Sequence, residues 1–243
     1  MTRYIYLFLI VAFITSCKTI SIAQDYQKTT TQNIQLGTVG EQKNFVLEQD
    51  YNHTALPKYQ TPIKVNVSVL DFNKTIHKAF ANAKENQNQA ITVNYVDSLK
   101  RKPKYLKLEI ADRVAVLNAL NSKENKDVFS FLETKTEAHL ISSIALALNP
   151  NDLIAITAAD EVFLEVTGIK NYALKLYKNK LVQQTIMFND GVVFAYKTSS
   201  CCWKQNDKYQ LEIVDLVQGR DKCPSDTYRF AKRAKKKIDY YKL

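Results

Sequence analysis

The chain has 243 residues, of which 46% are hydrophobic and 24% are charged, and its formal net charge is +10 at pH 7. This composition excludes an intrinsically disordered chain, because the apolar fraction is large enough to build a folded core. The sequence holds only five glycines and five prolines, which argues against a loop-rich or propeller-like design.

The N-terminus has the layout of an export signal. Arg3 precedes an uncharged apolar run of eleven residues, Tyr4 to Ile14, and Lys18 closes the apolar segment soon afterwards. Eleven helical residues cover only about half of a hydrocarbon core that is roughly 30 Å thick. The run therefore does not predict a membrane-spanning helix, and we expect residues 1–16 to be a signal peptide.

The end of this signal resembles the lipobox of bacterial lipoproteins. Residues 14–17 read Ile-Thr-Ser-Cys: an aliphatic residue, two small residues and a cysteine. The resemblance implies cleavage before Cys17 and attachment of fatty acyl chains, such as palmitate, to that residue, so that the protein is held at a membrane. Lys18, in place of an aspartate, implies the outer membrane of the cell envelope. Ordinary cleavage after Ala23 is the alternative, because residues 21–23 have a small-x-small pattern.

Residues 17–61 are expected to be the lipidated cysteine and a flexible tether. The segment is rich in Gln, Thr and Asn and shows neither helical nor alternating periodicity. A flexible chain of this length would span roughly 35–40 Å, enough to hold the domain at 62–243 clear of the bilayer. Part of the segment, such as residues 44–49, can instead pair as a strand.

The first half of the predicted domain mixes strands with short helices. Alternating apolar residues predict strands, and apolar residues at helical spacing predict helices. Residues 138–148 are ambiguous, but their β-branched content favours a strand. Asn149 and Pro150 suit the start of a helix. The predicted strands are 65–69, 105–110 and 138–148, and the predicted helices are 71–86, 111–120, 125–133 and 150–160.

The second half is predicted to be an antiparallel meander of about five strands joined by tight turns. Asp190-Gly191 between two apolar runs is the strongest hairpin signal. Residues 224–243 then predict an amphipathic helix, which Ser225 can cap. The predicted fold class is α+β, with the meander covered on one face by short helices and this C-terminal helix. The five strands are 162–166, 172–179, 181–188, 192–203 and 209–217.

Three cysteines remain beyond Cys17, and two of them predict a disulfide bond. Cys202 shares strand parity with residues expected to face the core, and Cys223 lies just before the C-terminal helix. A bond between them would fasten that helix to the sheet. Cys201 is the alternative partner. The spacing matches no zinc site and no redox C-x-x-C motif.

Two basic clusters are candidates for contact with an anionic surface, such as lipid headgroups, lipopolysaccharide or a cell-wall polymer. A solvated loop and a solvated helix face are the alternative interpretation. Nucleic acid is not expected as a partner, because an export signal removes the protein from it. The residues are Lys100, Arg101, Lys102 and Lys104 in the first cluster and Arg229, Lys232, Arg233 and Lys236 in the second.

No catalytic motif is apparent. The three histidines, His53, His77 and His139, lie in separate contexts, and no nucleophile elbow, phosphate-binding glycine loop or metal-ligand spacing accompanies them. We predict no catalytic residues, no metal and no cofactor. If the protein were an enzyme, scattered residues such as Asp112, His139 and Glu161 would have to assemble its site.

The sequence thus predicts a lipid-anchored protein of the cell envelope with a non-catalytic binding or scaffolding role. Its partners would be the membrane, through the lipid, and another envelope protein or an anionic envelope polymer. Two alternatives stay open. One is a periplasmic hydrolase that acts on cell-wall or lipid substrates, and the other is a carrier of a lipid or another hydrophobic ligand.

Overall fold

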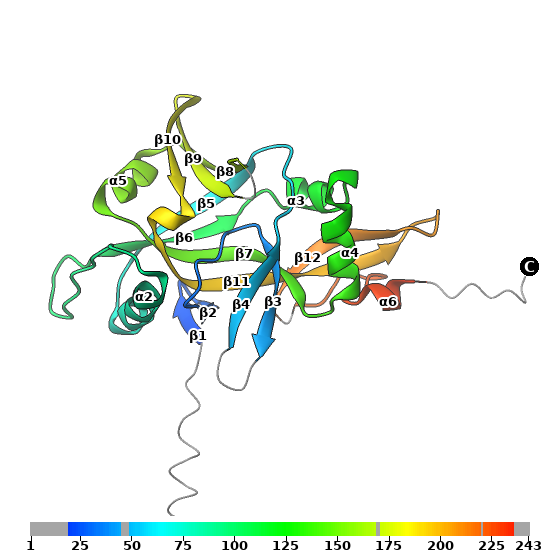
Figure 1. Ribbon diagram of the computed structural model, residues 1–243, viewed down its shortest axis with the longest axis horizontal. Coiled ribbons are helices and arrows are strands. Elements are labelled where there is room, and N and C mark those ends of the chain that lie inside the picture. The colour runs from blue at the N-terminus through cyan, green and yellow to red at the C-terminus, as the bar shows by residue number, and fades with distance from the viewer. Residues whose placement is uncertain (1–18, 45–48, 169–170, 220, 236–243) are drawn as a thin grey trace, which may run out of the picture.

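The structure is a computed structural model that describes residues 19–44, 49–168, 171–219 and 221–235 (Figure 1). It is a mixed fold in which short helices pack on one twelve-stranded, antiparallel sheet. This confirms the α+β class. The strands are β1 (Thr19–Ile22), β2 (Asp25–Thr29), β3 (Val39–Asn44), β4 (Gln49–Ala55), β5 (Ile63–Asp71), β6 (Lys104–Ile110), β7 (Ala138–Ala147), β8 (Glu161–Val166), β9 (Tyr172–Lys178), β10 (Leu181–Met187), β11 (Val192–Gln205) and β12 (Leu211–Gln218).

The helices begin where the sequence supplies caps. The side chain of Asn73 accepts a hydrogen bond from the Ile76 amide at the start of α2, and Asn149 caps α5 in the same way before Pro150. The α-helices are α2 (Lys74–Gln87), α3 (Arg113–Leu120), α4 (Lys126–Thr134), α5 (Pro150–Ala158) and α6 (Ala231–Ala234), and the 3₁₀ turns are η1 (Lys123–Asn125) and η2 (Phe188–Asp190).

Two long strands, β7 and β11, form the centre of the sheet. The strand order is β1-β2-β11-β7-β6-β5-β8-β9-β10, with β12 added to β11 and the β3–β4 hairpin added to β7. The meander is therefore confirmed only for β8, β9 and β10, and β11–β12 is a separate hairpin.

The hairpin predicted at Asp190-Gly191 is wrong. β10 pairs with β9, whereas β11 pairs with β7, β2 and β12. Residues 192–196 are all buried, so β11 needs strands beside it and cover above and below it. Gly191 serves close packing instead, because a Cβ there would lie 2.5 Å from a methyl carbon of Leu146.

Both faces of the sheet are covered, which corrects the expectation that helices cover one face. On β6, Leu106 and Leu108 belong to the larger core with α3 and α4, while Tyr105 belongs to a smaller core with α2. Neighbouring strand residues point to opposite faces. In Figure 1, α2 and α3–α4 accordingly lie on different parts of the sheet.

The flexible tether expected over residues 17–61 is wrong for the part that the structure describes. Residues 19–29 form the β1–β2 hairpin, and Ile34 and Leu36 are fully buried in the larger core. Asp25 pairs with Lys107 of β6 at 2.7 Å. The hairpin thus packs on the sheet, and the boundary expected at residue 62 falls inside the fold. Cys17, the expected lipidation site, lies outside the described residues.

The C-terminal helix expected from residue 224 is also different. Residues 224–230 are not helical, because the backbone of Tyr228 forms a two-way bridge with Trp203 of β11. These bonds satisfy the backbone groups that a helix would use. Only α6 follows, with Ala231 and Ala234 buried. The remainder of the expected helix, 236–243, lies outside the described residues.

The predicted disulfide between Cys202 and Cys223 is confirmed, with 5.7 Å between the two Cα atoms. Cys201 is a free, buried thiol. The parity argument selected the correct cysteine, although β11 has register shifts after residues 193, 197 and 202. Because of these shifts, Tyr196 and Cys201 face the larger core, and Phe194 faces the smaller one.

Candidate functional site

A cleft of about 390 Å³ opens where β2, β7 and β11 meet α4 and the segment that leads into α6. Leu132 of α4 and Phe230 contribute apolar surface. The polar lining comes from Lys28 on β2, His139 on β7, Ser200 on β11 and Arg229. The volume lies within the usual range of small-molecule sites, so the cleft is the leading candidate for a functional site.

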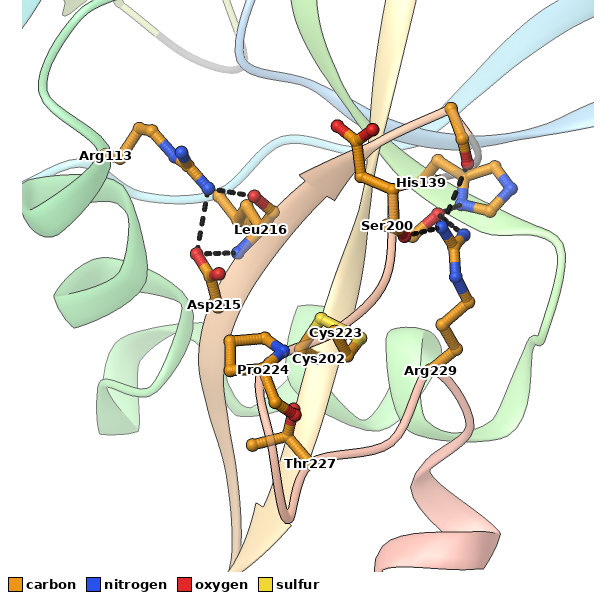
Figure 2. The surroundings of a disulfide bond; sticks show 12 residues. Arg113, His139, Ser200, Cys202, Asp215, Leu216, Cys223, Pro224, Thr227 and Arg229 are labelled. Carbon is orange, nitrogen blue, oxygen red and sulfur yellow. Dashed lines mark hydrogen bonds and ion pairs between the residues drawn. A yellow bond between two sulfur atoms is a disulfide. The ribbon is translucent and has the colours of Figure 1, made fainter.

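Ser200 is the centre of a compact polar group in this cleft. Its hydroxyl oxygen lies 3.3 Å from Nδ1 of His139 and accepts a hydrogen bond of 3.3 Å from Nη1 of Arg229. The two strands bring serine and histidine together because Ser199 pairs with Leu140 in the register of β11 and β7. Figure 2 shows the side chains of Arg229 and His139 converging on Ser200.

The Arg229 guanidinium is held in position by neutral groups. Its Nη2 donates to the backbone carbonyls of Gly219, at 3.0 Å, and Asp221. Among the described residues, none of the ion pairs involves Arg229. The charge is therefore fixed in direction without being neutralised by a carboxylate.

The disulfide explains why Arg229 lies where it does. Cys223 ties the segment after β12 to Cys202 on β11, and the Trp203–Tyr228 bridge repeats the attachment one residue before Arg229. The backbone is thus attached to β11 twice before Arg229, and the arginine side chain is held by the carbonyls of Gly219 and Asp221. Figure 2 shows the disulfide beside this segment.

His139 is neutral at pH 7. Burial lowers its pKa from the usual 6.5, and the charges of Lys28 and Arg229 lower it further, while Glu137 opposes them. The imidazole therefore has a free lone pair or an N–H group to offer, according to its tautomer. The start of β7 is fixed by Tyr51, whose hydroxyl donates to the carbonyl of His139 at 2.7 Å.

Cys201 also lines the cleft, but it is not a reactive thiol. Complete burial raises its pKa to about 12. A thiol is nucleophilic as the thiolate, which is negligible at that pKa near pH 7. Cys201 therefore contributes packing in the larger core rather than chemistry.

The three scattered residues that the hydrolase hypothesis named do not assemble. Asp112 caps α3 by accepting from the Ala115 amide at 2.9 Å, and Glu161 pairs with Lys64 at 2.8 Å. Of the three, only His139 lines the cleft. His77 stacks on Tyr95 with ring centroids 5.1 Å apart.

The two basic clusters lie at different ends of the molecule. Lys100, Arg101 and Lys102 belong to the segment between α2 and β6, at the opposite end of the long axis from α6 (Figure 1). Lys104 pairs with Asp71 at 2.8 Å and Lys102 lies 4.0 Å from Asp97. They do not form one continuous surface with the second cluster.

The residues of the second basic cluster lie in different surroundings. Arg229 lines the cleft, Arg233 lies over the ring of Phe230 at 5.5 Å, and Lys232 is exposed on α6. Lys236 lies outside the described residues. Sequence reasoning named Arg229 only as part of a charged helix face and did not name Ser200, because nothing local indicates that residues 139, 200 and 229 meet.

Among the residues that the structure describes, no group of three or more histidine, cysteine or acidic side chains could hold a metal ion. In the same part of the chain, no helix has the length and apolar character needed to cross a bilayer. Comparison with protein-family models, curated protein sequences and solved structures gives no match.

Proposed function

We propose that the protein is a lipid-anchored component of the cell envelope that binds another envelope molecule through the cleft around Ser200. Cys17 would carry the lipid and hold the protein at the outer membrane, and the α+β domain would have a non-catalytic binding or scaffolding role. The observation that supports binding most directly is the Arg229 charge, which is fixed on the cleft wall without a carboxylate partner in the described part of the chain.

A binding role agrees better with the polar group than a catalytic role does. Ser200 accepts a hydrogen bond from Arg229 and contacts His139, so its oxygen is already engaged by two neighbours. In the described part of the chain no carboxylate forms a hydrogen bond to the His139 ring, although such a partner orients the base in serine hydrolases.

The anchor is tested by the intact mass of the mature protein. A diacylglycerol-modified or triacylated Cys17 is expected as the first residue, and the variant Cys17→Ser should leave the membrane fraction. A mature chain that begins at Gln24 without added hydrocarbon would refute the anchor, since that start is the product of ordinary cleavage after Ala23.

The binding role is tested by site-specific photo-crosslinking in intact cells. A crosslinker at Tyr26, on the cleft rim, should give a discrete adduct that is lost in the variant Arg229→Gln. A crosslinker at Leu181, which is 67% exposed on β10, is the control and should not give that adduct. Equal adducts from both positions would contradict the proposal.

A periplasmic hydrolase remains the second candidate, and one observation favours it: Ser200 and neutral His139 are in contact at 3.3 Å. A serine activated by histidine could attack an ester of a cell-wall or lipid substrate. Covalent labelling by a fluorophosphonate that disappears in Ser200→Ala would favour the enzyme over the binding role. The carrier of a hydrophobic ligand gains no support from a cleft that Lys28, His139 and Arg229 line.

A further inference from the structure

We propose that the cleft recognises a phosphate group, with Arg229 as the principal binding residue and Ser200, His139 and Lys28 around it. The inference rests on the proposed binding function and specifies the chemistry of its ligand. It follows from the charge of Arg229, which has no carboxylate partner among the described residues, and from the number of hydrogen-bond donors that meet in the cleft.

Three ionic groups of the cleft wall have partners in ion pairs. Lys197 pairs with Asp25 at 2.9 Å and Lys135 lies 3.8 Å from Glu41, while Glu133 pairs with Lys235 at 2.7 Å. Arg229 has no such partner among the described residues. Glu137 also lines the cleft and acts electrostatically on Lys28 and His139, so the guanidinium of Arg229 is the place where an anion gains most.

The guanidinium is also pre-oriented for a ligand. Of the five N–H donors of an arginine side chain, three form the hydrogen bonds to Gly219, Asp221 and Ser200. Two N–H groups are then left to receive an anion. These groups, Nε–H and one Nη1–H, are not a parallel pair, so each would donate to a separate oxygen of the anion. Because the side chain is already ordered, binding loses little rotamer entropy.

The arrangement of the other donors favours phosphate over carboxylate. A carboxylate presents two oxygens in one plane, whereas a phosphate presents three or four oxygens in a tetrahedron. The donors here come from separate elements: Lys28 on β2, His139 on β7, Ser200 on β11 and Arg229 after β12. Donors that approach from several directions match a tetrahedral anion better than a planar one.

The rim of the cleft could hold the remainder of a phosphorylated molecule. Tyr26 and Phe230 are 78% and 39% exposed and both line the opening. The phosphate could belong to a soluble metabolite or to a lipid headgroup. A headgroup is within reach because β2 pairs with β1, which begins two residues after Cys17.

Calorimetric titration of the mature protein in detergent with phenyl phosphate tests the proposal. We expect binding that weakens at least tenfold in Arg229→Gln and less in Arg229→Lys, which keeps the charge but not the planar guanidinium. Arg233→Gln is the matched control, because Arg233 lies on Phe230 outside the cleft lining, and its affinity should not change.

Benzoate is the comparison ligand, since it replaces the phosphate by a carboxylate on the same ring. Tighter binding of benzoate than of phenyl phosphate, or equal affinity of Arg229→Gln and wild type, would overturn the inference. If Arg229→Gln does not fold, as judged by its thermal unfolding, Lys28→Gln supplies the second variant. It should weaken phenyl phosphate binding several-fold, and unchanged affinity would count against the proposal.

The source of the phosphate is separated with vesicles. The full chain with Cys17→Ser is mixed with phosphatidylcholine vesicles that do or do not contain phosphatidic acid. Arg229-dependent binding to phosphatidic acid assigns a lipid headgroup, and binding of phenyl phosphate without vesicle binding assigns a soluble compound. If neither phosphate ligand binds while the Tyr26 crosslink persists, the phosphate inference fails and the binding function stands.

Discussion

The hydroxyl groups of two buried tyrosines form hydrogen bonds that hold the segment between β2 and β5 in place. Tyr59 donates to the carbonyl of Gly37 at 2.7 Å, and Tyr172 donates to the carbonyl of Pro57. Both rings are buried and lie 5.5 Å apart. The Tyr59 bond lies within the segment between β2 and β5, and the Tyr172 bond connects that segment to the meander. No local sequence signal indicates either bond.

Replacing Tyr59 by phenylalanine should therefore lower the free energy of unfolding by about 1–3 kcal/mol, because the carbonyl of Gly37 would be left buried without a donor. Urea unfolding measures the loss. The matched control is Tyr209→Phe, since Tyr209 is 65% exposed and its change should stay within about 0.5 kcal/mol. Equal losses would show that the hydroxyl of Tyr59 contributes nothing.

The lowered pKa of His139 makes stability depend on pH. In the unfolded chain His139 has a pKa near 6.5, and in the folded chain its pKa is lower. The unfolded state therefore binds more protons as the pH falls, so acid favours unfolding. Stability from this residue is complete above pH 6.5 and decreases as the pH falls toward the folded pKa. The thermal midpoint of the wild type should thus fall more steeply than that of His139→Asn between about pH 7 and pH 5.

At this scale the sequence predicted little of the site. The type of each residue was visible, but residues 139 and 200 meet through strand register, and bulges in β7 and β11 set that register. Cys202 was identified by its strand parity, and its disulfide with Cys223 is confirmed. The role of Arg229 depends on two carbonyls that only the folded chain places around it.

Among the elements, the disulfide-bonded segment after β12 has a measurable role. In the chain-entropy description, a closed loop with a sequence separation of 21 stabilises the fold by about 3 kcal/mol. The variant Cys202→Ala/Cys223→Ala should lose that amount in urea unfolding and should also bind phenyl phosphate more weakly. Tyr59→Phe also lowers stability but keeps the disulfide and lies outside the cleft lining, so its affinity for phenyl phosphate should match the wild type. A similar loss of affinity there would contradict this role of the bond.

The β1–β2 hairpin is held on the sheet by a partly buried ionic network around Lys107. Lys107 is 7% exposed and contacts Asp25 at 2.7 Å and Glu109 at 3.0 Å, while Lys197 contacts the other oxygen of Asp25. Hydrogen bonds from Lys107 and then Lys197 lower the pKa of Asp25. The network gives the hairpin a specific position on the sheet.

We expect Asp25→Asn to lower the free energy of unfolding by about 2 kcal/mol at pH 7, because it leaves part of the buried charge of Lys107 uncompensated. Asp71→Asn breaks an exposed pair, with side chains 58% and 52% exposed, and should cost less than about 1 kcal/mol. The difference between them should shrink as the pH falls below 3.8 toward the folded pKa of Asp25. If the difference between the two stability losses does not change with pH, the role given to ionised Asp25 is refuted.

Element types were predicted well where local chemistry decides them. Asn73 and Asn149 act as helix caps in the structure, and residues 138–148 are largely the strand β7. The pairing of β-strands was predicted less well. Asp190-Gly191 has the composition of a hairpin turn, but β11 is buried on both faces and leaves β10 to pair elsewhere.

For the whole molecule, the main difference from expectation is the missing tether. Gln- and Thr-rich sequence at residues 24–35 suggested a flexible chain, yet isolated apolar residues such as Ile20, Ile22 and Ile34 are each at most 6% exposed. The alternation in β1 was present but spans only four residues. Such a short pattern is too weak to distinguish a strand from a linker.

The packed hairpin predicts that the domain lies directly on the bilayer if Cys17 is lipidated. Ser21 is exposed and only four residues from Cys17, a reach of about 14 Å in extended chain. A fluorophore on Ser21→Cys should be quenched by headgroup-labelled lipids. One on Leu181→Cys, on β10 at the far end of the sheet (Figure 1), should not, and equal quenching would argue against this orientation.

The position of β1 has a mechanical consequence. A pulling force on an acylated Cys17 would act on Thr19, which is only two residues away. In the described chain β1 pairs only with β2. Thr19 and Lys28 form the open end of that pair, so a pull would separate the strands one hydrogen bond at a time. Ile20 and Ile22 would then leave the smaller core, and extraction from the membrane by force would loosen the domain before it broke the anchor.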